Sequence, residues 1–293
     1  MLGLATWLVW GPIGLAIAIF AIGATLSLAP RVPASAIMKL YRGTIVAPDN
    51  SQLSSLVDVL AWRAQVAQRP ALYVIPSMTL NAFATGTSES AAIAVTEGLL
   101  RRLTLREIAG VLAHEMSHVR NNDVWVMGFA DLITRFLQMM SYLALGLALF
   151  NIVATFTQDE TIPWAAILVL YLAPALSSGL QLGLSRAREF DADADAARLT
   201  GDPLGLASAL RRLETSTGRF WEDLMFPVPA RRVPLPSLLR THPDTEDRVR
   251  RLLELTGDPA HEPIVIVEQP MVSLVGYGPG DMRPRYRWPG LWY

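Results

Sequence analysis

The 293-residue chain contains no cysteine and only four histidines. Without thiols, disulfide scaffolds, cysteine-ligated zinc modules, iron–sulfur ligation and thiol nucleophiles are all excluded. Charged residues make up 17% of the sequence, below the roughly 25% of an average soluble domain, and the formal net charge is −1. This composition is atypical of an ordinary soluble protein, and it argues against a nucleic-acid partner bound through bulk positive charge.

Three long stretches carry no charged side chain: residues 4–28, 136–158 and 161–185. Each exceeds the ~18 residues that a helix needs to span a bilayer. Only Asp159 and Glu160 separate the last two, so we expect a tight antiparallel hairpin. Buried core helices are the alternative for the hairpin, and a cleavable signal peptide is the alternative for the first stretch, which lacks a basic start. The sequence thus predicts about three transmembrane helices, with the lipid bilayer as a partner.

Basic residues flank these stretches on one side only. They follow the first stretch, precede the second and follow the third, whereas the hairpin tip and the N-terminus carry none. Basic residues accumulate on the cytoplasmic side of membrane proteins. We therefore expect an integral membrane protein with its polar domain in the cytoplasm and its N-terminus outside.

The polar part of the chain combines short strands with helices, which gives the fold class α+β, mostly helical. Residues 71–76 and 91–96 are short apolar runs with β-branched content and predict a small sheet. Thr104-Leu-Arg-Glu107 has the spacing of a capping box before apolar residues at helical spacing, so a helix is expected over 105–122. The other expected elements are an amphipathic stretch near 51–68, helices near 186–199 and 246–255, and a proline-rich loop over 226–236.

Two of the four histidines lie in His114-Glu-Met-Ser-His118 on this expected helix. Their i, i+4 spacing puts both imidazoles on one face, where they can bind one Zn²⁺, and Glu115 lies beside the open coordination position. Two surface histidines are the alternative, because so short a pattern also arises by chance. A metzincin-type third histidine is absent, since position 124 is a valine.

A carboxylate must then complete the ligand set. The helix expected after the hairpin supplies Glu189, and Asp193 shares its face at i, i+4. Asp193 is placed to accept a hydrogen bond from a ligand histidine, which would fix the tautomer of that imidazole. A solvated acidic helix face is the alternative, and it fits Asp191 and Asp195 better than Glu189. The predicted ligands of one Zn²⁺ per chain are His114, His118 and Glu189.

Taken in order along the chain, these motifs resemble the HtpX-type integral-membrane zinc metalloproteases of the gluzincin clan, relatives of the CAAX prenyl-protein endopeptidases. The matching pieces are His114-Glu-Met-Ser-His118 with Asn121-Asn-Asp123, the membrane hairpin, and Ser185-Arg-Ala-Arg-Glu189-Phe-Asp-Ala-Asp193. Asn81-Ala-Phe-Ala-Thr-Gly86 resembles the family's edge strand over the active-site cleft, and Thr241-His242-Pro243 with Arg248 resembles its C-terminal element. The sequence departs from HtpX in one respect. HtpX has a membrane hairpin before its catalytic domain, whereas a single N-terminal span is expected here.

The resemblance implies a zincin-like catalytic domain that hydrolyses peptide bonds, with Glu115 as the general base. His242 would donate a hydrogen bond to the tetrahedral oxyanion, and Arg248 would orient His242 or bind substrate carbonyls. An extended peptide would add to the edge strand, whose expected substrate-binding residues are Asn81, Ala82, Phe83 and Ala84. The implied substrates are misfolded or damaged membrane proteins, cleaved on the cytoplasmic side as part of protein quality control.

Two other functions stay open from the sequence. A CAAX-type prenyl-protein endopeptidase would share the zinc motifs. In those enzymes, however, more transmembrane helices than the three expected here form a cage. A non-catalytic membrane scaffold with structural zinc would normally use four protein ligands and no adjacent base. The expected order of domains is an N-terminal transmembrane anchor (1–30), the first catalytic part (31–124), the hairpin (125–185), the second catalytic part (186–256) and a C-terminal tail (257–293).

Overall fold

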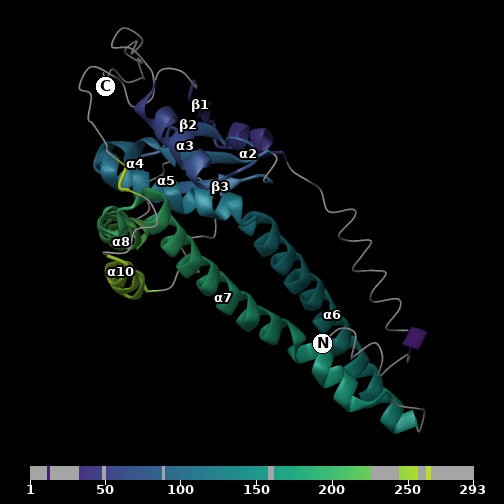
Figure 1. Cartoon of the computed structure of the whole chain (residues 1–293). Helices are drawn as coiled ribbons and strands as arrows, with labels where there is room; N and C mark the ends of the chain where they lie inside the picture. Colours follow the sequence, from purple (N-terminus) through teal and green to yellow (C-terminus); the bar gives the residue numbers. More distant parts are fainter. Residues whose placement is uncertain are drawn as a thin grey trace. The chain divides into compact units, whose positions relative to one another are not determined.

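The computed structural model describes residues 12–13, 33–47, 51–87, 90–157, 162–225, 244–256 and 262–264, with the backbone alone over 215–225 (Figure 1). These residues fall into two compact units. The hairpin unit contains the described residues between 125 and 187, and the sheet unit contains those in 32–124 and from 188 onward. Outside the described residues lie the expected N-terminal span, the proline-rich loop, His242 and most of the C-terminal tail.

A four-stranded mixed sheet forms the centre of the sheet unit. Its strands are β1 (Thr44–Ile45), β2 (Ala71–Ile75), β3 (Ala82–Thr85) and β4 (Ala92–Thr96), in the spatial order β1-β2-β4-β3. β2 and β4 run parallel, and each edge strand is antiparallel to its neighbour. Every residue of β4 is buried, as its central position requires. The expected small sheet with an edge strand is confirmed.

Helices cover both faces of this sheet (Figure 1). On one face, α2 (Ala34–Leu40) packs Met38 into an apolar cluster with Phe83 of β3. On the other face lies the larger core, to which α3 (Gln52–Arg63), α4 (Glu97–Arg102) and α5 (Leu105–Arg120) contribute. Because side chains alternate along a strand, Ala82 and Ala84 face this larger core and leave room for α5.

The helix α5 is almost entirely buried and begins where the sequence predicts. The amide of Thr104 donates to the Glu107 carboxylate at 2.8 Å, and the Glu107 amide donates back to the Thr104 hydroxyl at 3.3 Å. The helix α8 (Pro203–Met225) packs closely against α5 at Gly110, where an added Cβ would lie 2.9 Å from the Leu206 Cα. The helix α10 (Thr245–Glu254) packs on α8 in turn.

Two long helices, α6 (Asp123–Thr157) and α7 (Trp164–Thr200), build the hairpin. Among the described residues, they are the two helices long and apolar enough to cross a membrane. Asn151 secures the hairpin because its side chain donates to the Ile162 carbonyl at 2.6 Å and accepts from the Ile162 amide at 2.9 Å. Thr134 and Ser177 join the two helices through their hydroxyls, 2.9 Å apart.

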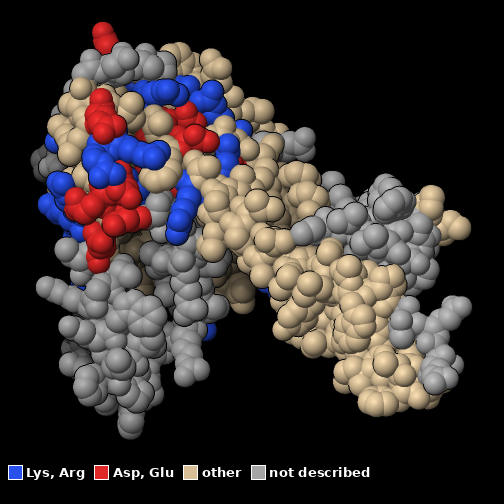
Figure 2. Space-filling view, turned by 90° about the horizontal axis from the view of Figure 1, so that it is seen from below, with Lys and Arg blue, Asp and Glu red and all other residues tan. Residues whose placement is uncertain are grey.

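Large apolar side chains point outward along the hairpin. Met139, Phe156 and Leu180 are 63%, 85% and 77% exposed. Figure 2 shows charged side chains gathered on the sheet unit, whereas the visible face of the hairpin is almost entirely uncharged. A contiguous apolar surface of this kind is unfavourable in water and matches a lipid environment.

Both long helices extend beyond the uncharged stretches of the sequence. The helix α6 begins at Asp123, before the stretch 136–158 and close to the expected start of the hairpin at 125, and α7 continues without a break to Thr200, where the sequence predicts a span and a separate helix. Residues 186–199 contain no glycine or proline and are rich in good helix formers, so nothing ends the helix at Ser185. The expected third ligand therefore lies on the same helix as an expected span.

Candidate metal centre

The helix α5 presents His114, Glu115 and His118 from the interior of the sheet unit, and all three side chains are buried. One helical turn separates the histidines, so their imidazoles face the same side. Their Nε2 atoms are 3.2 Å apart, and the two rings meet edge to face. Two nitrogen lone pairs can therefore point at one position.

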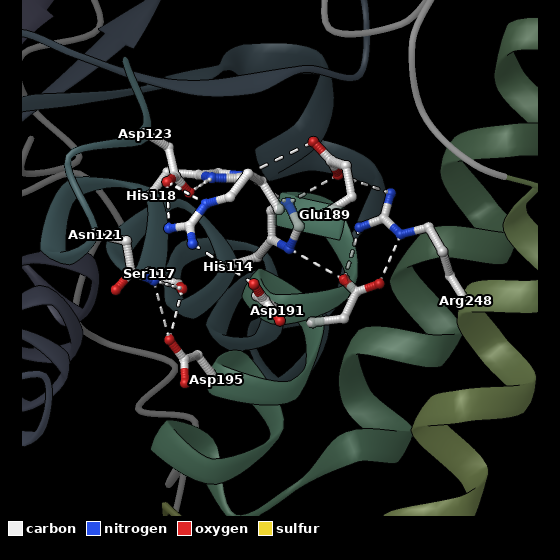
Figure 3. Close-up of polar contacts among 11 residues, drawn as sticks. His114, Ser117, His118, Asn121, Asp123, Glu189, Asp191, Asp195 and Arg248 are labelled. Carbon is white, nitrogen blue, oxygen red and sulfur yellow. Dashed lines mark hydrogen bonds and ion pairs between the residues drawn. The ribbon is translucent and has the colours of Figure 1, made fainter. Parts of the chain in front are cut away.

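The helix α7 brings Glu189 to the same position (Figure 3). One carboxylate oxygen lies 3.5 Å from His114 Nε2, and the other lies 3.8 Å from His118 Nε2. One ligand atom from each of the three residues lies within 4.8 Å of the others. Two imidazoles and one carboxylate form a donor set that catalytic zinc sites use.

The distances between these donor atoms fit a tetrahedral ion. With metal–ligand bonds of about 2.0–2.1 Å, two ligands of a tetrahedral Zn²⁺ lie about 3.4 Å apart. The observed separations of 3.2, 3.5 and 3.8 Å are close to that value. Three protein ligands also leave one coordination position open, as catalysis requires.

On one side of the site, two charged residues support His114. Asp193 Oδ1 lies 3.1 Å from His114 Nδ1, and Arg248 of α10 donates two hydrogen bonds of 2.7 Å to the same carboxylate. The Arg248 guanidinium also lies 3.4 Å from the Glu189 carboxylate. We call His114, Asp193 and Arg248 the His114 branch; its side chains are at most 8% exposed.

A second set of residues supports His118 in the same way. His118 Nδ1 lies 2.7 Å from Asp123 Oδ2, and Asp123 forms an ion pair with Arg188 of α7. We call His118, Asp123 and Arg188 the His118 branch. The sequence analysis assigned no role to Asp123 or Arg188. The sequence does contain an indication of the role of Asp123, which belongs to the Asn121-Asn-Asp123 segment that follows the histidines.

The charge of His114 depends on its two carboxylate neighbours. Burial lowers the pKa of His114, but hydrogen bonds to Asp193 and Glu189 and their negative charges outweigh burial and raise this pKa to about 10. The metal-free imidazole therefore carries a proton at neutral pH. A bound cation must displace this proton, because a metal ligand needs the neutral ring.

Asp195 fixes the two ligand-bearing helices against each other. Its carboxylate accepts hydrogen bonds from the Ser117 hydroxyl at 2.9 Å and from the Asn121 amide at 3.2 Å (Figure 3). The expectation of a solvated face is therefore wrong for Asp195, since the contact lies between helices. It fits Asp191, whose side chain is 64% exposed.

The strand β3 lies beside α5 and is an edge strand of the sheet among the described residues. The Thr96 amide donates to the Asn81 carbonyl at 3.0 Å, so in the antiparallel pairing residues 81, 83 and 85 bond to β4. The backbone groups of Ala82 and Ala84 consequently point away from β4. An added strand would find its hydrogen-bonding partners at these two alanines.

Two of the expected substrate-binding residues are placed differently from the expectation. The Phe83 side chain is buried, and its ring centroid lies 5.4 Å from that of Tyr41, while its backbone pairs with β4. Arg248 is buried against Asp193 and Glu189. Alternation along the strand thus turns the Phe83 side chain into the core, and Arg248 bonds the acidic residues of the metal centre; the roles of both residues in substrate binding stay predictions.

A capped helix with the His-Glu-x-x-His pattern, a glutamate from a second helix and an open edge strand define a metallopeptidase. The profile of peptidase family M48 matches residues 47–256. The chain belongs to peptidase family M48.

Curated relatives agree with this family assignment. A protease HtpX homolog of Acaryochloris marina is 42% identical over 231 residues, covering 74% of this chain and 77% of the relative. A protease HtpX homolog of Nostoc sp. is 35% identical over 268 residues, covering 87% and 91%. The crystal structure of S. mikatae Ste24p has 22% identity and a TM-score of 0.44, and the match spans 81% of this chain and 56% of that one. On the family match and the two curated relatives, the chain is a membrane metalloprotease, a hydrolase of peptide bonds.

Proposed function

We propose that this protein is a zinc-dependent endopeptidase of the bacterial inner membrane that cleaves misfolded or damaged membrane proteins on the cytoplasmic side, in protein quality control. The chemical part of this proposal rests on ligand atoms of His114, His118 and Glu189 that lie within 4.8 Å of one another. Glu115 lies on the same helix as the two histidines. The basic residues that flank the hairpin support the cytoplasmic side. Membrane substrates are supported by α7, which continues from the apolar hairpin to Glu189.

In this proposal His114, His118 and Glu189 hold one zinc ion. When bound, zinc supplies a Lewis acid that polarises the scissile carbonyl and lowers the pKa of water. Asp193 and Asp123 each engage the Nδ1 side of one imidazole, so both Nε2 lone pairs remain directed at the ion. The support residues therefore set the tautomer and the orientation of both rings.

Glu115 acts as the general base. It takes a proton from the attacking water and delivers this proton to the leaving amine. Glu115 is 7% exposed, and its side chain interacts electrostatically with the Arg248 guanidinium. His242 is proposed to donate a hydrogen bond to the oxyanion, a contribution of about 3 kcal/mol in comparable enzymes.

The substrate is proposed to bind as an additional strand along β3. The backbone groups of Ala82 and Ala84 supply the hydrogen bonds, and Asn81 lies at the start of the edge. Because recognition through the backbone makes few demands on side chains, we expect broad sequence preference. Unfolded segments would be favoured, since only an extended chain can pair in this way.

The variant Glu115→Gln tests the proposal. Cleavage of an unfolded membrane protein should fall by roughly 10²–10⁴-fold, the range that general acid–base catalysis contributes, while the zinc content stays unchanged. Glu97→Gln is the matched control because Glu97 lies on the surface and pairs only with Arg101 in the next turn among the described contacts. Cleavage by Glu115→Gln at the wild-type rate would contradict the assignment.

The proposed cytoplasmic side can be tested separately. The chain has no cysteine, so Glu254→Cys at the end of α10 introduces a unique thiol. A membrane-impermeant maleimide should label this thiol in inverted vesicles and leave it unlabelled in intact spheroplasts. The opposite labelling pattern would place the sheet unit outside the cytoplasm.

A further inference from the structure

Asp123 and Arg188 stand at the two points where the chain passes between the sheet unit and the hairpin unit. Asp123 is the first residue of α6, and Arg188 is the first residue of the sheet unit after the hairpin. Both residues belong to the sheet unit, and they form an ion pair with each other. The two crossing points are thus held together by one contact.

This contact continues to a histidine of the metal centre. The side chain of Asp123 is 5% exposed, and its second oxygen lies 2.7 Å from His118 Nδ1. Arg188 also has a looser partner in Asp191, at 3.5 Å, on the exposed face of α7. The buried partner is the stronger one, because water screens the exposed pair.

We infer that the Asp123–Arg188 pair positions His118 for metal binding. The inference rests on the proposed function, because it requires His118 to be a ligand. Asp123 accepts the Nδ1 hydrogen of the imidazole, which leaves the Nε2 lone pair free and fixes the plane of the ring. Arg188 holds the Asp123 carboxylate in the orientation that this hydrogen bond needs.

A purely structural role would produce a different result. A pair that only joined α6 to α7 would contribute to the stability of the metal-free fold and leave the affinity for zinc unchanged. A positioning pair acts on the ligand, so its loss weakens zinc binding even when the protein is folded. The dissociation constant for Zn²⁺ and the unfolding temperature of the metal-free protein therefore distinguish the two roles.

The experiment uses the full chain purified in detergent, with Zn²⁺ titrated against a chromogenic chelator. Asp123→Asn should weaken zinc binding by about 10- to 100-fold, and Arg188→Gln by about tenfold, as for other residues that support metal ligands. Arg188→Lys should recover part of the loss, because it restores the charge without the two-pronged geometry. The control is Arg198→Gln, on the same helix, where the side chain is 60% exposed and lies 3.8 Å from Asp195.

Each outcome decides the inference. Weaker zinc binding in Asp123→Asn and Arg188→Gln, with metal-free Arg188→Gln unfolding within about 4 °C of the control, supports it. Wild-type zinc affinity in both variants overturns it and leaves the proposed function intact. If the wild-type chain itself binds no Zn²⁺, the proposed function fails, and the inference fails with it.

Discussion

The two branches of the metal centre use the same device in different surroundings. In each, an aspartate lies next to a histidine Nδ1 and an arginine holds the aspartate. The arginine of the His114 branch, Arg248, is 6% exposed and comes from α10, whereas Arg188 of the His118 branch is 25% exposed and stands where the hairpin joins the sheet unit. One histidine is therefore anchored in the core, and the other is anchored at the boundary of the unit.

The loss of zinc affinity should be about the same when the histidine of either branch is removed. His114→Ala and His118→Ala each remove one of three proposed ligands. If a zinc-binding free energy of ~12 kcal/mol is shared equally among the three, each loss costs about 4 kcal/mol. This corresponds to about a thousandfold weaker zinc binding. Chelator competition on the purified chain measures both losses. A large loss in only one of the two variants would show that the other histidine is not a ligand.

The branches should differ in the stability of the metal-free protein. Arg248→Gln leaves the buried Asp193 without its guanidinium and should cost about 3 kcal/mol of unfolding free energy. Arg188→Gln should cost about 1 kcal/mol, because water reaches this arginine. Chemical denaturation of the two metal-free variants tests this order, and equal losses would remove the distinction between core and boundary.

Acid should weaken zinc binding through the His114 branch. The pKa of His114 is raised from 6.5 to about 10, so protonation stabilises the metal-free fold below pH 6.5, and this stabilisation is lost as pH rises toward 10. Zinc needs the neutral imidazole, so its affinity should fall about tenfold for each unit of pH from 8 to 6. Titrations at several pH values measure this slope. Asp193→Asn should flatten it, whereas a slope of zero in the wild type would contradict the raised pKa.

The smallest effect should come from a change common to both branches. Thr104→Ala removes the cap of α5, which carries both histidines, and should cost about 1 kcal/mol of unfolding free energy. Zinc affinity should stay within about twofold of wild type, because the cap lies far along the helix from the ligands. Thr104→Ser keeps the hydroxyl and serves as the control. A change in zinc affinity beyond that range would show that the start of α5 also sets the site.

The local parts of the site could be predicted from the sequence because short spacing determines them. The i, i+4 histidines and the capping box lie within one helix, so helical geometry alone places His114, Glu115 and His118. The strands β2 and β4 could be predicted for a similar reason, from short apolar runs, whereas the edge strand β3 was expected only from the family resemblance. The positions of Asp193 and Glu189 on one face of a helix also follow from spacing.

The partners that come from distant segments could not be predicted in the same way. Arg188 lies 65 residues from Asp123, and Arg248 lies 55 residues from Asp193. Only the tertiary packing of the helices brings these residues together, and no local spacing in the sequence predicts it. The sequence does not predict the continuous α7, because the apolar run ends near Ser185 although the helix does not. Polarity changes at a membrane boundary without any change in backbone conformation.

The most direct test of the account is a crystal structure of the zinc-loaded chain with anomalous diffraction measured on both sides of the zinc absorption edge. The account predicts one anomalous peak per chain, bounded by His114 Nε2, His118 Nε2 and the Glu189 carboxylate. A peak bounded by other side chains, or no peak in a preparation that retains peptidase activity, would contradict it.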